Sequence, residues 1–417
     1  MKILISAFAC VPGHGSEPGV GWGVVQQAAK RHQVWVLTDA DPRREVEAGL
    51  AAAPAPSLHF TFISGPGGLK NLRHKWILEQ LYYILWQFMA FNAARRLHRQ
   101  VGFDLVHHVT YVNSWLPIWM GWLGVPFIWS AGTKDRLPWP FLKGISWQGR
   151  ISEVLRNSAM AALGSFTYYS VAQKSSLILS GSAPQVWPGS LPVIRFPLGG
   201  LLQEETTILG QIPARQGNPV RFVSIGRLLG WKGFAMALKA FARLYGDPAL
   251  SENGVNTEYW IIGDGPERPY LEQLAGRLGC RERVRFWGWR PRSEVWRLLA
   301  EVDILVLPSL HESCSIVLLE AMAAARPVIC LDAGGPAQVA HNDCGFIIPV
   351  HNPEQVTHDL TAAFKRLALD PKLRQRMGRA ARARFLQEYP WDRQGEKIDT
   401  FYEMVASTDV RHRRVGQ

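Results

Sequence analysis

The chain has few cysteines, and none of them stands in a metal-binding pattern. Its five cysteines are scattered over 417 residues and form no Cys-x-x-Cys pair. An odd number of scattered cysteines in a chain of this size argues against a disulfide framework and against a zinc site. The N-terminal stretch "MKILISAFAC" has too short an apolar run for a secretory signal. We therefore expect a reducing compartment and a cytoplasmic location.

Acidic residues are also fewer than basic ones, 34 against 46, which leaves a formal net charge of +12. Such a charge can serve nucleic acid, an anionic membrane or a phosphorylated substrate, or can simply keep the protein soluble. No nucleic-acid-binding module is present in the sequence, so we expect no nucleic-acid partner. Neither half carries the Gly-x-Gly-x-x-Gly fingerprint with its acidic partner, which argues against a nicotinamide dehydrogenase.

What the sequence does contain is a twice-repeated alternation of short apolar strands and helices. In the first half the expected strands are 2–9, 33–38, 58–64, 103–111 and 125–131, with a helix at 20–32. After a linker at 197–219, further strands are expected at 220–226, 258–265, 283–288, 303–309, 327–332 and 345–350. Buried strands separated by helices indicate parallel sheets covered on both faces. The predicted fold class is α/β, with two tandem doubly wound domains at 1–200 and 201–390. A terminal helix in 391–417 is expected to cross back to the first domain and to end in a basic tail.

The stretch "HESCSIVLLEAMA" sets Glu312 and Glu320 eight positions apart around an apolar run. Carboxylates in such a run are costly to bury unless a polar group meets them. A helix is expected to start near Ser313–Ser315, after the strand 303–309, and its N-terminus would offer free N–H groups and partial positive charge. The expected free N–H groups are those of Ser315, Ile316 and Val317. A diphosphate binds such a helix end without a metal, and two flanking carboxylates suit the hydroxyls of a nucleotide sugar. The simpler alternative is two solvated helix residues.

Glycine and basic residues follow two other expected strands. The stretch "GRLLGWKG" carries Arg227 and Lys232 behind Gly226, and glycine lets backbone approach a phosphate while the cations stabilise it. The N-terminal stretch "PGHGSEPGVGWG" is a glycine-dense loop, where Gly19 and Gly21 could let phosphate or sugar approach the backbone. Two further strand ends carry glycine, in "GDGP" at 263–266 and "DAGGPAQV" at 332–339, and simple turn chemistry explains these two equally well.

These stretches together resemble one enzyme family. "ESCSIVLLE" followed by "AMAAARPVI", with "GRLLGWKG", "GDGP" and "GGPAQ" in order, is similar to the retaining glycosyltransferases of family 4. That family has the two-Rossmann-domain architecture called GT-B. The resemblance is strong over 220–350 and looser in the first half, where "SEPGVGW" and "DLVHHVTY" carry it.

The resemblance implies roles for particular residues. Arg227 and Lys232 would grip the donor diphosphate, Glu312 would contact the donor sugar, and Glu320 would contact the ribose. A histidine of the N-terminal domain would lie near the sugar, and the doublet leaves both His107 and His108 open, with His107 favoured by its distance from Asp104. The candidate catalytic residues are Glu312, Arg227, Lys232, His107 and His108. The candidate donor-binding residues are Gly226, Ser315, Ile316, Val317, Glu320, Gly288, Gly19 and Gly21, with Gly288 in the segment expected near the base. Ser315 and Gln338 depart from the family pattern, in which glycine or proline and glutamate are usual.

The reaction implied is transfer of a sugar from a GDP- or UDP-sugar to an acceptor hydroxyl with retention of anomeric configuration. The second domain would bind the donor, and the first would bind a saccharide or lipid-linked acceptor in polysaccharide or glycolipid biosynthesis. We expect no cofactor and no obligate metal. Three alternatives stay open: an Asp-x-Asp metal site at Asp39 and Asp41, a nucleotide-sugar epimerase of the same fold, and a non-catalytic nucleotide-sugar-binding protein.

The segment 72–100 is an apolar, aromatic helix with basic ends. Polar residues interrupt it, so it is not expected to span a membrane. A helix at the surface of an anionic membrane and a buried core helix are the two interpretations, and the first makes the protein peripheral on the inner face of the membrane. Lys134 and Arg136 are candidates for an acceptor phosphate.

Overall fold

The computed structural model describes residues 1–417 except 66–75, 112–114, 133–136, 182–191, 216 and 416–417. Lys134 and Arg136, the start of the expected helix 72–100 and the end of the basic tail lie outside the described residues. The chain divides into two compact units. Unit 1 consists of Met1–Lys134, Met160–Gly200 and Trp391–Gln417, and unit 2 consists of Asp135–Ala159 and Leu201–Pro390.

Unit 1 is built on a seven-stranded sheet in which every pairing is parallel. Its strands are β1 (Lys2–Ser6), β2 (Gln33–Asp39), β3 (Leu58–Ile63), β4 (Leu105–His108), β5 (Phe127–Ala131), β6 (Leu177–Ser180) and β7 (Val193–Arg195). They lie in the order β3-β2-β1-β4-β5-β6-β7. Its helices include α1 (Ser16–Ala29), α2 (Arg43–Ala52), α4 (Trp76–Val101) and α16 (Trp391–Val415).

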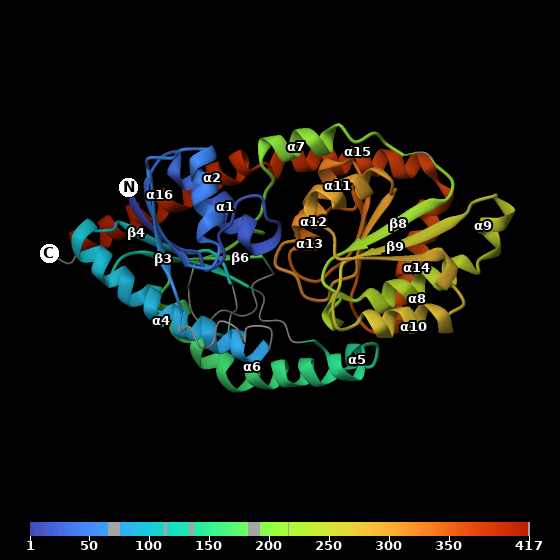
Figure 1. The fold of residues 1–417 in the computed structure, drawn as a ribbon, viewed down its shortest axis with the longest axis horizontal. Helices are drawn as coiled ribbons and strands as arrows, with labels where there is room; N and C mark the ends of the chain where they lie inside the picture. The colour runs from blue at the N-terminus through green and yellow to red at the C-terminus, as the bar shows by residue number, and fades with distance from the viewer. Residues whose placement is uncertain (66–75, 112–114, 133–136, 182–191, 216, 416–417) are drawn as a thin grey trace. The chain divides into compact units, whose positions relative to one another are not determined.

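Unit 2 is built on a six-stranded parallel sheet in the order β10-β9-β8-β11-β12-β13. The strands are β8 (Val220–Ile225), β9 (Thr257–Ile262), β10 (Val284–Gly288), β11 (Ile304–Leu307), β12 (Val328–Leu331) and β13 (Gly345–Ile348). Figure 1 shows α8 (Phe234–Tyr245), α10 (Arg268–Arg277) and α14 (Pro353–Leu369) on one face of this sheet. The opposite face carries α11 (Arg292–Ala300), α12 (Ile316–Ala323) and α15 (Pro371–Glu388) (Figure 1). The expectation of two doubly wound parallel sheets is confirmed.

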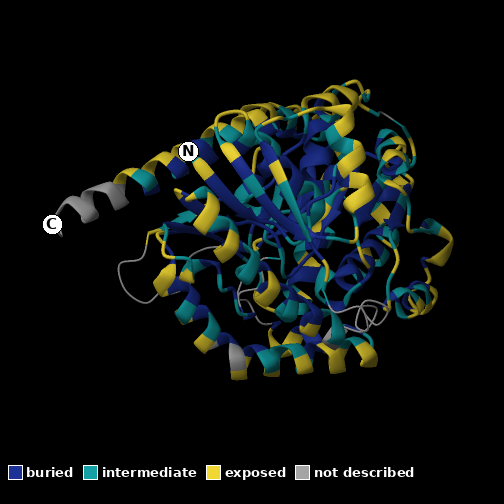
Figure 2. Cartoon of the chain, turned by 60° about the vertical axis from the view of Figure 1, so that its left-hand side comes forward, coloured by how far each residue is buried: buried dark blue, intermediate teal, exposed yellow. Residues whose placement is uncertain are grey.

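The core of unit 2 forms where helices close over the strands. Phe222 of β8 stacks on Phe364 of α14 with ring centroids 4.6 Å apart, and both side chains are fully buried. Figure 2 shows that the strands are largely buried and that exposed residues lie on the outer sides of the helices. Burial on both faces explains why these strands read as unbroken apolar runs in the sequence.

Three details of the expected organisation are wrong. The strands β6 and β7 were missed. The expected linker 197–219 contains a helix, α7 (Gln203–Gly210). The first helix begins at Ser16 rather than near residue 20, so much of the expected glycine loop is helical.

Residues 135–159, expected in the first domain, belong to unit 2. They include α5 (Trp139–Leu142) and the first part of α6 (Trp147–Lys174). Phe141, Leu142 and Ile145 are buried in the hydrophobic core of unit 2. Glu267, itself buried, accepts hydrogen bonds from the backbone N–H of Ser146 (3.0 Å) and from its hydroxyl. Apolar burial and this carboxylate fix the segment to unit 2.

The helix α16 belongs to unit 1, where it packs on α1. The Lys30 ammonium donates to the Asp392 carboxylate at 2.6 Å. The His32 ring lies 2.6 Å from a carboxylate oxygen of Asp399. Among the described residues, no helix is both long enough and apolar enough to cross a membrane.

Candidate functional site

The strand order of unit 2 locates the place where a ligand is expected. The order β10-β9-β8-β11-β12-β13 reverses direction between β8 and β11. In open parallel sheets, ligands bind outside the carboxyl ends of the strands at such a switch point. The loops that leave β8 and β11 at that point are 226–233 and 308–315. These loops contain the expected catalytic residues Arg227, Lys232 and Glu312.

Backbone contacts hold the two loops together. The N–H of Leu310 donates to the carbonyl of Trp231 at 2.8 Å. Gly233 has φ +69°, and a Cβ on it would lie 2.0 Å from the carbonyl oxygen of Pro308. Only glycine adopts this left-handed conformation without strain and also leaves room for the neighbouring backbone. The position of Lys232 is therefore fixed by contacts with the loop that carries Glu312.

Lys232 and Glu312 form an ion pair within the site. The ammonium nitrogen lies 2.5 Å from a carboxylate oxygen, and the side chains are 19% and 14% exposed. Each retains hydrogen-bonding capacity, because an ammonium has three donors and a carboxylate has about four acceptor positions. Arg227 is exposed, and its guanidinium makes no hydrogen bond or ion pair within the described part of the chain. The loop thus presents one oriented ammonium and one exposed guanidinium.

The helix α12 begins between the two glutamates, as expected. Ser315 is its N-cap, with extended backbone at φ −116°, and its side chain makes no capping hydrogen bond. The first backbone bonds inside the helix run from the N–H groups of Leu318 and Leu319 to the carbonyl of Ser315. The N–H groups of Ser315, Ile316 and Val317 therefore precede the helical ladder, and this end carries partial positive charge.

The loop after β12 supports the start of α12. The N–H of Gly335 donates to the carbonyl of Glu312 at 2.9 Å. A Cβ on Gly335 would lie 1.8 Å from the carbonyl oxygen of Ser313. Any larger residue at 335 would push the backbone before α12 out of place. The "GGPAQ" stretch thus positions the helix end that is expected to hold the diphosphate.

Glu320 lies inside α12, where it is 2% exposed. Burial raises the pKa of its carboxyl, and the charge of Arg292 acts against that rise. The guanidinium of Arg292, from α11, donates to Glu320 at 2.6 Å and also to Glu205 of α7. The three residues form an acid–base–acid cluster. Sequence reasoning missed both partners, because Glu205 falls in the expected linker and Arg292 stands in no motif.

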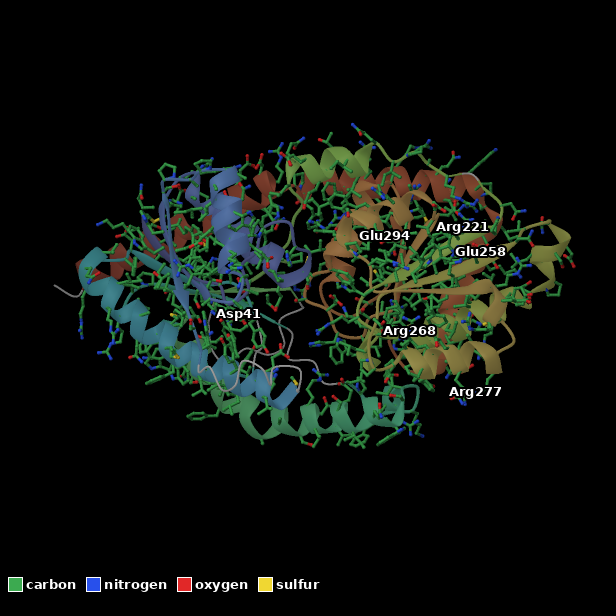
Figure 3. The ribbon with its side chains drawn as sticks, in the orientation of Figure 1. Asp41, Arg221, Glu258, Arg268, Arg277 and Glu294 are labelled. Carbon is green, nitrogen blue, oxygen red and sulfur yellow. The ribbon has the colours of Figure 1, made fainter. Side chains whose placement is uncertain are left out.

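Gly288, expected near the base of the donor, ends β10 with φ +71°. Its carbonyl accepts from the N–H of Gly263 at 2.8 Å. A Cβ on Gly288 would lie 3.2 Å from a guanidinium nitrogen of Arg268. Figure 3 shows Arg268 at the start of α10, where it pairs with Asp264 (3.1 Å) and Glu272 (3.0 Å). Arg268 is therefore a cation beside the predicted base segment that no sequence motif indicated.

Gly19 and Gly21 lie within α1 instead of in an open loop. A Cβ on Gly19 would lie 2.0 Å from the carbonyl oxygen of His14, and one on Gly21 would lie 2.2 Å from that of Ala9. Both glycines therefore let α1 approach the chain that follows β1. Their contact with a donor stays a prediction.

His107 and His108 are both fully buried in unit 1. The ring of His107 lies 2.8 Å from the Tyr402 hydroxyl and 2.9 Å from the Ser130 hydroxyl. The ring of His108 lies 3.1 Å from the Ser6 hydroxyl and 3.4 Å from that of Tyr83. Burial lowers the pKa of each to about 3, so both rings are neutral near pH 7. They point in different directions, as alternate strand residues do, and both have hydroxyl partners inside unit 1.

The Asp-x-Asp alternative fits the structure poorly at its first residue. Asp39 is 4% exposed, and one of its carboxylate oxygens accepts from the Tyr82 hydroxyl at 2.9 Å. The same oxygen accepts from the N–H of Ala40 at 3.0 Å. Within the described ranges, no group of three or more histidine, cysteine, aspartate or glutamate side chains could hold a metal ion.

The model of the family described as glycosyl transferases group 1 matches residues 207–384. Residues 207–384 belong to that family. This matched region contains the loops after β8 and β11, with Lys232, Glu312 and Glu320. The resemblance drawn from the sequence motifs is confirmed.

Curated relatives match this chain over a limited length. The lipopolysaccharide core biosynthesis glycosyltransferase LpsD of Rhizobium meliloti is 37% identical over 155 residues, which are 37% of this chain and 41% of that protein. The alpha-D-kanosaminyltransferase of Streptomyces kanamyceticus is 30% identical over 182 residues, 43% of this chain and 45% of that protein. The chain thus spans less than half the length of the curated relatives that it matches.

Solved structures extend the likeness to the whole fold. Sucrose-phosphate synthase of Thermosynechococcus elongatus superposes with a TM-score of 0.65 at 18% identity, covering 98% of this chain and 99% of that one. HepE of Anabaena, in complex with UDP and glucose, superposes with a TM-score of 0.59 at 16% identity, covering 97% and 99%. The chain has the GT-B fold of these glycosyl transferase structures.

Proposed function

We propose that the protein transfers a sugar from a nucleoside diphosphate sugar to an acceptor hydroxyl, with retention at the anomeric carbon. The observation that carries the proposal is the Lys232–Glu312 ion pair beside the start of α12 at the switch point of unit 2. The ammonium and the helix N–H groups supply positive charge for a diphosphate, and the carboxylate supplies an acceptor for sugar hydroxyls.

The chemistry follows from where charge develops. The bond from the anomeric carbon to the diphosphate oxygen breaks, and the electron pair goes to the diphosphate. The acceptor oxygen forms the new bond on the same face of the sugar, and its proton passes to the leaving diphosphate oxygen. Arg227, Lys232 and the N-terminus of α12 stabilise the charge on the leaving group, which is the main catalytic contribution in such a reaction. No enzyme nucleophile and no metal are needed in this scheme.

The remaining donor contacts are proposals of the same kind. Glu320 would accept hydrogen bonds from the ribose hydroxyls, and Arg292 holds its carboxylate in place. Gly288 and the neighbouring Trp289, whose side chain is 72% exposed, would lie beside the base. UDP-glucose is our first candidate donor, since HepE was solved with UDP and glucose. A GDP-sugar is the other candidate.

The acceptor is proposed to be a saccharide or a lipid-linked saccharide, since LpsD acts in lipopolysaccharide core biosynthesis. A peripheral membrane contact through α4 is part of this proposal. One side of α4 packs into the core, because it carries the buried residues Tyr82, Tyr83 and Trp86. Its other side exposes Phe88 and Met89. The exposed basic residues of the same helix are Arg95, Arg96 and Arg99.

The thiols are consistent with a reducing compartment. All five cysteines are free, and burial raises the pKa of Cys314 and Cys330 to about 12. Free buried thiols are typical of intracellular proteins. We therefore keep the cytoplasmic face of the membrane as the proposed location.

A donor panel tests the proposed function. The protein is incubated with UDP- and GDP-sugars, with and without lipopolysaccharide core acceptors, and nucleoside diphosphate release is measured. We expect release that depends on acceptor, and loss of release in Arg227→Ala. Arg277→Ala is the matched control, an exposed arginine at the end of α10 that is expected to keep full activity (Figure 3). An altered nucleotide sugar formed without acceptor would indicate an epimerase, and tight donor binding without any release would indicate a binding protein.

A further inference from the structure

Unit 2 exposes large apolar side chains on α5 and on the first part of α6. Trp139 is 73% exposed and Trp147 is 68% exposed. Ile151 and Leu155 are each 52% exposed. On α6, Trp147, Ile151 and Leu155 are spaced four residues apart, so they share one side of the helix. A row of exposed apolar side chains on one side of a helix marks an interaction site more often than scattered single side chains do.

The opposite side of the same segment is packed tightly. Ile145 is buried, and a Cβ on Gly230 would lie 2.9 Å from its side chain. The Arg156 guanidinium lies over the ring of Trp231 at 5.6 Å from the centroid, and Arg156 also donates to the buried carboxylate of Glu153 at 2.9 Å. The inner side therefore holds the helix against the loop that carries Lys232. The exposed outer side takes no part in that packing.

The charge of the outer side has one sign. Residues 139–159 contain one acidic residue, Glu153, which is 2% exposed. Lys143 and Arg150 are exposed. The Arg150 guanidinium donates to the carbonyls of Lys143 (3.1 Å) and Ile145 (3.3 Å), which fixes it at the start of α6. The face thus combines tryptophans, aliphatic side chains and cations, with no exposed anion.

We propose that this face of unit 2, formed by Trp139, Lys143, Trp147, Arg150, Ile151 and Leu155, docks on an anionic lipid surface. Tryptophan favours the boundary between headgroups and acyl chains, where its ring is buried and its N–H stays hydrated. Aliphatic side chains on a helix that lies in the membrane plane enter the acyl boundary, and lysine and arginine attract anionic headgroups. The absence of an exposed carboxylate on the segment removes the repulsion that such headgroups would meet.

The surface is separate from the one on α4. It lies in unit 2, on the segment that the sequence had placed in the first domain. The rest of α6 belongs to unit 1, and there Phe166 and Tyr169 are 80% and 41% exposed. Because α5 and α6 pack on the loop that carries Lys232, lipid docking holds that loop near the membrane surface. The inference does not depend on the identity of the sugar or on turnover.

Vesicle co-sedimentation of the full chain tests the proposal. We expect the wild-type protein to bind vesicles of equal parts phosphatidylglycerol and phosphatidylcholine, and to bind pure phosphatidylcholine more weakly. Ile151→Asp is expected to lower the partition coefficient between membrane and water about tenfold or more. The substitution replaces an aliphatic side chain that enters the membrane by a charge in the headgroup region. Lys143→Gln and Arg150→Gln are each expected to lower it about fivefold on anionic vesicles.

The matched control is Ile208→Asp. Ile208 is 50% exposed on α7 of the same unit, so the substitution removes the same side chain at the same exposure outside the proposed face. It is expected to bind vesicles like the wild type. Thermal unfolding of both variants checks that they remain folded.

Three results would overturn the inference. Wild-type protein that binds neither kind of vesicle would do so, and so would Ile151→Asp binding as strongly as Ile208→Asp, since α4 alone would then suffice. A dimer in light scattering that Ile151→Asp dissociates would assign the face to a second copy of the chain. None of these results depends on sugar transfer, so a failure here is distinct from a failure of the proposed function.

Discussion

Lys232 and Glu312 stand eighty residues apart in the sequence, yet their side chains meet at 2.5 Å. The contact joins the loop after β8 to the loop after β11 at the switch point of the sheet. Each side chain holds the other in position at the place where a diphosphate and its sugar are proposed to lie. This relationship gives the first prediction.

Lys232→Ala should lower the rate of nucleoside diphosphate release about a hundredfold, because it removes the ammonium that faces the developing charge on the leaving group. The effect should appear in kcat, since the charge is larger in the transition state than in the bound donor. Steady-state kinetics measure it. Lys372→Ala, an exposed lysine in the first turn of α15, is the control and should behave as wild type. Wild-type kcat in Lys232→Ala would remove Lys232 from the site.

Arg292→Met should destabilise the protein by about 3–5 kcal/mol, because it leaves the buried Glu320 carboxylate without its cation. Urea unfolding measures the change. Arg297→Met, at an exposed position of the same helix, should shift the free energy of unfolding by less than about 0.5 kcal/mol. The double variant Arg292→Met/Glu320→Gln should recover part of the loss, because the fully buried carboxylate is then replaced by a neutral amide and only Glu205, whose side chain is 12% exposed, is left without its cation. If the double variant were less stable than Arg292→Met, burial of an unpaired carboxylate would not be the cause.

Glu320 also gives a prediction about the donor. Glu320→Gln keeps the shape of the side chain but accepts hydrogen bonds more weakly than a carboxylate does. We expect a higher KM for the donor with a smaller change in kcat, as a ground-state contact to ribose predicts. A fall in kcat with unchanged KM would assign Glu320 to the reacting centre instead.

Stability should fall as the pH is lowered from about 6.5 towards about 3. The pKa of His107 and His108 is lowered to about 3 by burial, so in this window the unfolded chain binds more protons than the folded one. Each histidine contributes a slope of up to about 1.4 kcal/mol per pH unit. Urea unfolding of His107→Gln at pH 6.5 and pH 5 should show a smaller loss than wild type. His351→Gln, at an exposed site before α14, is the control and should keep the wild-type slope.

Gly233→Ala should destabilise the protein and lower turnover. The added Cβ would lie 2.0 Å from the carbonyl oxygen of Pro308, and φ +69° is strained for alanine. A loss of about 1–3 kcal/mol in the free energy of unfolding is expected. Gly276→Ala, in the helix α10 with no atom within 4 Å of the added Cβ, should stabilise the protein slightly. Equal effects of the two substitutions would contradict the packing between the loops.

Treatment with EDTA should leave turnover unchanged. Positive charge for the diphosphate comes from Lys232, Arg227 and the end of α12, which need no divalent cation. Nucleoside diphosphate release with and without EDTA measures this. Loss of activity that Mn²⁺ restores would support the Asp39 and Asp41 alternative.

Much of unit 2 could be predicted because its signals are local. Glu312 and Glu320 flank the start of one short helix, so their spacing alone fixes their relation to the helix end. Three strands of this sheet are largely buried runs that stop directly before a glycine or a proline: β8 before Gly226, β9 before Gly263 and β11 before Pro308. Strands and helices marked by such local patterns can be predicted without knowing which distant residues pack against them.

The missed parts depend on contacts between distant residues. Arg292 and Glu205 are 87 positions apart, and neither stands in a pattern that would predict their contact. The pairing shows only once α7 and α11 are packed on α12. The histidine doublet presents a related difficulty. A strand period predicts that His107 and His108 face opposite ways, but it does not predict their hydroxyl partners. These are Tyr402 of α16, 295 positions from His107, and Tyr83 of α4, 25 positions from His108.

The assignment of residues 135–159 to unit 2 bears on how the protein could be dissected. The chain passes between the units at 134/135, 159/160, 200/201 and 390/391, so no single cleavage separates them. A fragment ending at residue 200 would leave Phe141 and Ile145 without their core and α1 without α16. A chimaera that exchanges one of the two units with a homologue must therefore replace at least two separate segments of the chain. A chimaera with a single crossover at residue 200 should precipitate.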